Sequence, residues 1–142
     1  GSGRLRPSIM RIALDTNVIV RFLVRDDEAQ AQAVYARFKQ AEADREALFV
    51  PLLVVIEAVW VLESTYGKSR KDILDSFDEL KSMSILTFEK DQVMQALLSE
   101  GRKSNVDLSD LLIALASESC GCSGAITFDK KAAKFPFFRL LT

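Results

Sequence analysis

Two aspartates directly follow short apolar runs of the kind that form buried strands. Asp15 comes after Ile12–Leu14, and Asp129 comes after Ala125–Phe128. Open parallel sheets bind ligands beyond the carboxyl ends of their strands, so both carboxylates are candidates for chemistry at a sheet edge. Glu89 follows a similar run and qualifies equally on spacing. The other interpretation is structural: Asp15 could form an Asx turn or cap the next helix, and Asp129 could be a solvated helix start that complements the helix dipole.

Two further acidic residues lie in strongly apolar helical segments. Glu57 is the one charge within Leu52–Leu62. We expect it to be buried, where an unpaired carboxylate is costly unless it meets an arginine, a metal or a substrate. Asp110 opens the apolar run Leu111–Leu115 and is preceded by Asp107. These two aspartates also fit a plain helix start, with one as the N-cap and the other in the first turn.

The absence of histidine narrows the chemistry that these residues can perform. Imidazole catalysis and histidine-ligated zinc are both excluded, so carboxylates must carry any acid–base or metal chemistry. Ionised carboxylates that lie within a few ångströms of one another repel unless a divalent cation holds them. Carboxylate and water ligands suit Mg²⁺ or Mn²⁺, which can activate a water and stabilise charge on a phosphate under attack.

Short apolar runs alternate with amphipathic runs along the chain. Strand character is found at 12–14, 48–50, 85–88, 125–128 and 137–140. Helical spacing is found at 17–23, 31–41, 51–66, 69–80, 93–97 and 111–116. This alternation predicts an α/β protein with parallel strands and helices on both faces of the sheet.

The composition indicates a globular domain of ordinary size. The chain has 142 residues, of which 49% are hydrophobic and 27% are charged. Such a chain can bury a core, which argues against disorder. Its net charge of −1 excludes a uniformly basic coat for nucleic acid. No apolar run reaches the ~20 residues that cross a bilayer, so we expect no membrane association.

Four segments place acidic residues beside apolar or small polar neighbours. In chain order they are Leu14–Val18, Glu57 before Trp60–Leu62, Asp107–Ala114 and Thr127–Lys131. Together they resemble the acidic motifs of PIN-domain ribonucleases, and the resemblance is closest to the VapC toxins of bacterial toxin–antitoxin pairs. It covers nearly the whole chain after Met10.

The resemblance implies that Asp15, Glu57, Asp110 and Asp129 are catalytic and line a site for Mg²⁺ or Mn²⁺. It leaves open whether Asp107 is a further acidic neighbour or only a helix cap. It also implies a PIN-like three-layer α/β/α fold with a central parallel sheet.

The resemblance also implies an activity, with Asn17 and Thr127 as polar support. The protein would be an endoribonuclease that cleaves RNA phosphodiester bonds with metal-activated water. It would be the toxin of a type II pair, with RNA as its substrate and a cognate antitoxin as its partner. The alternative within the family is a housekeeping nuclease that processes RNA.

Two alternatives lie outside that family. A HAD-like phosphatase also uses an aspartate at a strand end, but it needs a second aspartate two positions on, where this chain has Asn17. A binding module without catalysis could use a carboxylate-lined pocket for contact alone. Metal-dependent cleavage of phosphodiester bonds distinguishes these classes.

The remaining expectations concern the limits and the setting of the domain. Residues 1–9 are expected to be an expression scar or a disordered N-terminal extension, and residues 10–142 a single PIN domain. The two cysteines, Cys120 and Cys122, are too close in sequence to link distant segments, which favours a reducing, cytoplasmic setting. A homodimer is expected because Trp60, within Leu52–Leu62, and Phe135–Phe138 offer more apolar surface than a small core consumes.

Overall fold

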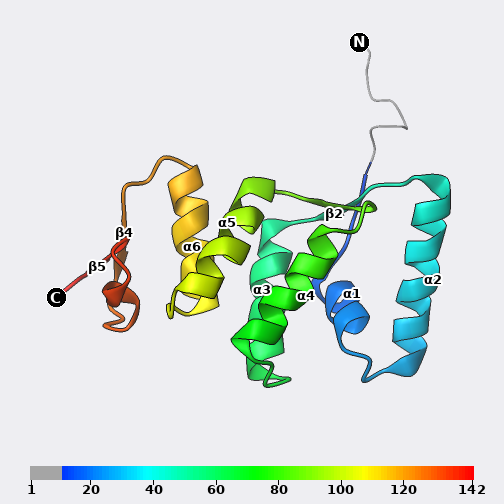
Figure 1. Ribbon diagram of the computed structural model, residues 1–142, viewed down its shortest axis with the longest axis horizontal. Helices are drawn as coiled ribbons and strands as arrows, with labels where there is room; N and C mark the ends of the chain where they lie inside the picture. The colour runs from blue at the N-terminus through cyan, green and yellow to red at the C-terminus, as the bar shows by residue number, and fades with distance from the viewer. Residues whose placement is uncertain (1–10) are drawn as a thin grey trace, which may run out of the picture. The chain divides into compact units, whose positions relative to one another are not determined.

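The computed structural model describes residues 11–142 (Figure 1). The scar or extension predicted for residues 1–9 lies outside the described residues. The chain forms two compact units: unit 1 contains residues up to 58 together with 79–89, and unit 2 contains 59–78 together with 90–142. That residues 10–142 form one domain stays a prediction.

Unit 1 is built on a parallel sheet of three short strands, in the order β1-β2-β3. The strands are β1 (Ile12–Ala13), β2 (Leu48–Val50) and β3 (Leu86–Phe88). Ile12 pairs with Leu48, which pairs with Leu86. Each pair runs parallel, as the alternation of runs predicts for an α/β protein.

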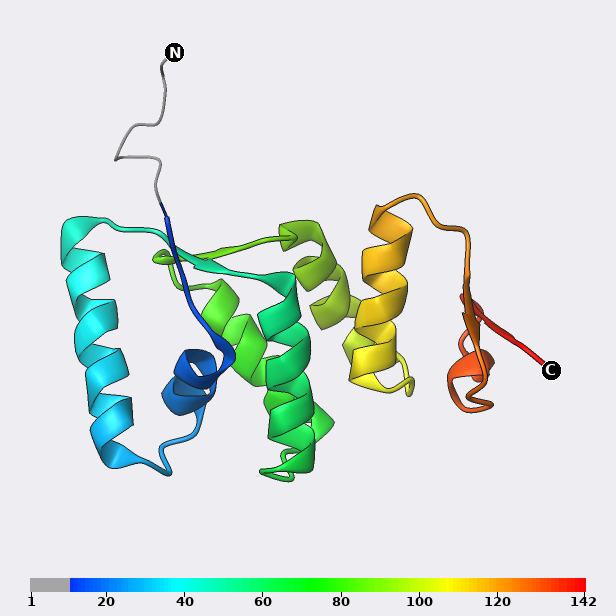
Figure 2. The ribbon, with the colours of Figure 1, turned by 180° about the vertical axis from the view of Figure 1, so that it is seen from behind.

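Two helices of unit 1 pack against each other after the first strand (Figure 2). They are α1 (Thr16–Leu23) and α2 (Glu28–Asp44). Each begins at an aspartate whose carboxylate accepts a backbone N–H: Asp15 from Val18 at 3.1 Å, and Asp27 from Gln30 at 3.0 Å. These caps satisfy donors that a helix start leaves free, so they fix where both helices begin.

The helix that carries Glu57 corrects one expectation. In α3 (Leu52–Ser64), Val54, Val55, Ala58, Val59 and Leu62 are buried. Leu53, Glu57 and Trp60 are exposed, and Leu53 and Trp60 keep 68% and 60% of their surface. The prediction that Glu57 is buried is therefore wrong. The three exposed residues are spaced i, i+4 and i+7, so they share one stripe of the helix, and the core takes the opposite face.

Unit 2 contains helices α5 (Asp91–Lys103) and α6 (Leu108–Ser119), which lie side by side (Figures 1 and 2). Helix α4 (Arg70–Lys81) begins in this unit and starts at Ser69, whose Oγ accepts the N–H of Asp72 at 3.1 Å. Helix α5 packs closely against its neighbours at Gly101. A Cβ there would lie 3.0 Å from Leu74 Cδ2 of α4 and 3.4 Å from Leu108 Cδ2 of α6.

The last two strands of unit 2 pair with each other in parallel. They are β4 (Ala125–Thr127) and β5 (Phe138–Leu140), with a short 3₁₀ helix, η2 (Ala132–Lys134), between them. Ala114, Ala132 and Phe138 form a small buried cluster, against which Phe135 and Phe137 pack. The expectation that Phe135–Phe138 offers free apolar surface is therefore wrong for Phe138, because the cluster buries this ring.

None of the helices in the described part of the chain is both long enough and apolar enough to cross a membrane.

Candidate functional site

Three aspartates of unit 2 line one cavity. Its volume is about 950 Å³, and its walls include Asp107, Asp110 and Asp129 together with Glu63 and Arg70. Asp110 and Asp129 are two of the four predicted site residues. The cavity adds Asp107, whose part the resemblance leaves open, and the two charged residues Glu63 and Arg70.

The start of α6 positions Asp110. The Asp107 carboxylate accepts the backbone N–H of Ser109 at 3.1 Å and that of Asp110 at 3.3 Å. Asp107 is thus the N-cap that the structural interpretation predicts, and Asp110 lies in the first turn. Because the cap fixes the backbone at this point, it also fixes where the Asp110 side chain leaves the helix.

The negative charge of each carboxylate in this cavity makes its neighbours harder to ionise. Burial raises the pKa of Asp110 above its ordinary value, and the charges of Asp107 and Asp129 raise it further. Burial and the charge of Asp107 likewise raise the pKa of Glu63, which Arg70 opposes. A cation placed among these groups would relieve the repulsion.

Asp129 lies just beyond β4, where the turn into η2 holds it. Its Oδ1 accepts the N–H of Lys131 at 2.8 Å and that of Ala132 at 3.4 Å. The Thr127 hydroxyl accepts the N–H of Asp129 at 3.0 Å. Asp129 therefore holds the turn into η2, and it also lines the cavity. Thr127 supports the backbone of Asp129.

The other two predicted site residues belong to unit 1 and are connected through Thr16. Asp15 caps α1, and the next residue, Thr16, donates from Oγ1 to Oε1 of Glu57 at 2.8 Å. The first turn of α1 thus fixes the Glu57 carboxylate across 41 positions of sequence. Sequence reasoning did not assign a role to Thr16, and its place directly after Asp15 was the only signal.

Glu89, which qualified as well as Asp129 on spacing, has a structural role in unit 1. Its Oε1 accepts the backbone N–H of Leu52 at 2.8 Å, at the start of α3. A position at the end of a strand therefore does not distinguish Glu89, which caps a helix start, from Asp129, which lines the cavity.

The donor chemistry fits a hard divalent cation. The candidate ligands are carboxylate oxygens, which such cations prefer. Two basic side chains, Lys131 and Lys134, line the same cavity as Asp110. Within residues 11–142, no group of three or more acidic or cysteine side chains is close enough together to hold an ion as it stands. Of the four predicted ligands, two belong to each unit: Asp15 and Glu57 to unit 1, and Asp110 and Asp129 to unit 2.

Comparison with known proteins identifies the family. A model of the PIN domain family matches residues 12–138. The chain belongs to the PIN domain family. This PIN domain is also 25% identical over 124 residues to a VapC ribonuclease of Aquifex aeolicus (strain VF5), a match that covers 87% of this chain and 91% of that protein. No solved structure matches it significantly.

Family membership confirms the resemblance drawn from the four acidic segments. It is consistent with the three-layer α/β/α fold expected for a PIN domain, and the α/β class itself is confirmed by the parallel strands. The HAD-like phosphatase is thereby set aside.

Proposed function

We propose that this PIN domain is an endoribonuclease that hydrolyses RNA phosphodiester bonds with Mg²⁺ or Mn²⁺. The observation that carries the proposal is the cavity of unit 2, where Asp110 lies among further carboxylates and beside Lys131 and Lys134. The similarity to a VapC ribonuclease supports RNA as the substrate.

The proposed roles follow from the chemistry of each side chain. Asp110 and Asp129 hold the divalent cation, and Asp15 and Glu57 are the remaining catalytic and metal-binding carboxylates. When bound, such a cation supplies Lewis acidity and a more acidic water. Lys131 and Lys134 attract the phosphate backbone without selecting a sequence, so binding should weaken as salt rises.

The direct test is incubation of purified protein with total RNA, in Mg²⁺ or Mn²⁺ and in chelator. Cleavage should require the metal. Cleavage that continues in chelator contradicts metal dependence, and RNA binding without any cleavage favours the non-catalytic binding module.

We further propose that the protein is the cytoplasmic toxin of a type II pair, neutralised by a cognate antitoxin. Induction in its native host should then arrest growth, and co-expression of the antitoxin should restore it. The Asp110→Asn variant is the control, because it should be harmless at equal expression. If induction of demonstrably active enzyme leaves growth unchanged, the housekeeping RNA-processing nuclease is the better assignment.

We also propose a homodimer, and the exposed stripe of α3 supports it. Leu53 and Trp60 are large apolar side chains on one stripe of this helix and expose 68% and 60% of their surface, which a partner subunit would cover. Light scattering at micromolar concentration should give twice the monomer mass of 15.8 kDa. Trp60→Glu should shift the protein to the monomer, whereas a wild-type monomer under these conditions refutes the proposal.

A further inference from the structure

Arg70 links α4 to both ends of the segment that joins α5 to α6. Its Nε donates to the carbonyl oxygen of Gly101 at 2.8 Å, and its Nη1 donates to that of Val106 at 2.6 Å. The first carbonyl lies in the last turn of α5, and the second lies directly before Asp107. A single planar guanidinium therefore fixes where this segment begins and where it ends.

The two carbonyls need such a donor. Those in the last turn of a helix lack a partner within it, so the Gly101 oxygen must find one elsewhere. Gly101 also packs closely against α4 and α6, because a Cβ there would be crowded by the side chains of Leu74 and Leu108. An arginine fork presents two N–H groups at fixed angles, which the compact ammonium of a lysine does not.

The arrangement also shows what Arg70 does not do. Its third nitrogen, Nη2, is buried and has no hydrogen-bond partner in the described part of the chain. The other two nitrogens already bind backbone carbonyls. Two of the three nitrogens of this guanidinium therefore bind the backbone and the third is buried, although the side chain lies at the wall of the cavity.

The segment that Arg70 holds leads directly into the candidate site. Within it, the Ser104 hydroxyl accepts the N–H of Val106 at 3.0 Å. The next residue, Asp107, caps α6 through the N–H groups of Ser109 and Asp110. A shift of Val106 would move this cap, and with it the first turn that carries Asp110.

We propose that Arg70 is a positioning residue: by clamping the carbonyls of Gly101 and Val106 it holds Asp107 and Asp110 at the cavity. It acts through the backbone and touches neither metal nor RNA. The catalytic consequence rests on the proposed ribonuclease function, whereas the clamp itself can be measured without RNA.

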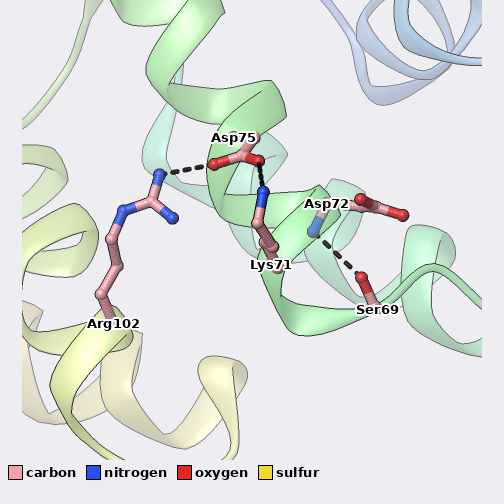
Figure 3. A network of polar contacts seen from close by, with 5 residues as sticks. All are labelled: Ser69, Lys71, Asp72, Asp75 and Arg102. Carbon is pink, nitrogen blue, oxygen red and sulfur yellow. Dashed lines mark hydrogen bonds and ion pairs between the residues drawn. The ribbon is translucent and has the colours of Figure 1, made fainter.

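The test compares Arg70→Met, Arg70→Lys and a matched control in the same helix pair. The control is Asp75→Ala, which removes the exposed tie between α4 and α5 drawn in Figure 3. There the Asp75 carboxylate accepts hydrogen bonds from Nη2 of Arg102 at 2.8 Å and from Nζ of Lys71 at 2.7 Å. Substitutions at Arg70 and at Asp75 each remove a contact between α4 and α5, but only those at Arg70 release the residue before Asp107.

Three measurements separate positioning from general loosening. For Arg70→Met we expect kcat to fall about 10–100-fold with KM changed less than about twofold, since supporting residues of a metal site have effects of this size. Mn²⁺ titration followed by electron paramagnetic resonance should show a weaker Kd. Backbone amides of residues 104–110 should exchange hydrogen faster. Arg70→Lys should resemble Arg70→Met, and Asp75→Ala should resemble wild type in all three.

Several outcomes would overturn the clamp. One is a kcat in Arg70→Lys equal to that of wild type. Another is an effect of Arg70→Met on KM alone. The third is equal hydrogen exchange of the amides of residues 104–110 in the Arg70 variants and in wild type. If Arg70→Met does not fold, Arg70→Lys decides by the same criteria. If wild-type protein cleaves no RNA, the proposed function fails while the exchange comparison still decides whether Arg70 holds the segment.

Discussion

Asp110→Asn should reduce metal-dependent RNA cleavage at least about a thousandfold while the protein still melts cooperatively. Asparagine keeps the size of the side chain but removes the charge that would hold the cation. The lost stabilisation of transition-state charge by the cation is several kcal/mol, and each 1.36 kcal/mol lowers the cleavage rate tenfold. The Asp107 cap contacts residue 110 through its backbone N–H and not through its side chain, so the substitution leaves the start of α6 intact. The measurement is single-turnover cleavage in Mg²⁺ and in Mn²⁺, with circular dichroism as the check on folding.

Two further variants make this experiment specific. Asp72→Asn is the matched control, because Asp72 also lies in the first turn of a helix of unit 2 but is exposed and is not part of the cavity lining. Asp15→Asn should lose activity as Asp110→Asn does, although asparagine caps a helix about as well as aspartate. Loss of activity there would therefore reflect the missing charge. Cleavage that persists in Asp110→Asn protein free of contaminating nuclease would contradict the proposed site.

Mg²⁺ or Mn²⁺ should raise the melting temperature of the wild-type protein by about 5–10 °C. A cation that binds only the folded state stabilises it by about 2.7 kcal/mol at a hundredfold excess over Kd, which corresponds to a shift of this order in a chain of this length. Asp110→Asn should gain much less from the metal. In chelator it should melt higher than wild type, because it lacks a half-buried charge that Asp107 and Asp129 oppose.

The pH dependence of that difference has a definite sign. The pKa of Asp110 is raised above its ordinary value of 3.8, first by burial and then by Asp107 and Asp129. The folded protein therefore binds this proton more tightly than the unfolded chain does, and the associated stability is lost as pH rises through the folded pKa. In chelator, the stability advantage of Asp110→Asn over wild type should be absent well below pH 3.8 and should grow as pH rises from there through the folded pKa of Asp110. An undiminished metal-induced shift in Asp110→Asn would place the cation elsewhere.

The sequence by itself determined the local structure of this protein. The expected strand at 48–50 is β2 (Leu48–Val50), and the expected caps at Asp15 and Asp107 each accept a backbone N–H two or three residues ahead. Such features depend on neighbours within one helical turn, so residue type and spacing suffice to predict them. The parallel pairing followed in the same way, because a helix lies between successive strands.

The tertiary structure alone decided which residues those elements bring together. Composition made Glu57 look buried, yet α3 turns its stripe of Leu53, Glu57 and Trp60 away from the core. In the sequence Arg70 lies between Lys68 and Lys71, and nothing there indicates its partners, which lie 31 and 36 positions away. An amphipathic pattern states that one face is apolar but not what covers the other, and a hydrogen bond between distant residues leaves no period in the sequence. Exposure and long-range partners are therefore set by packing, which only the folded chain specifies.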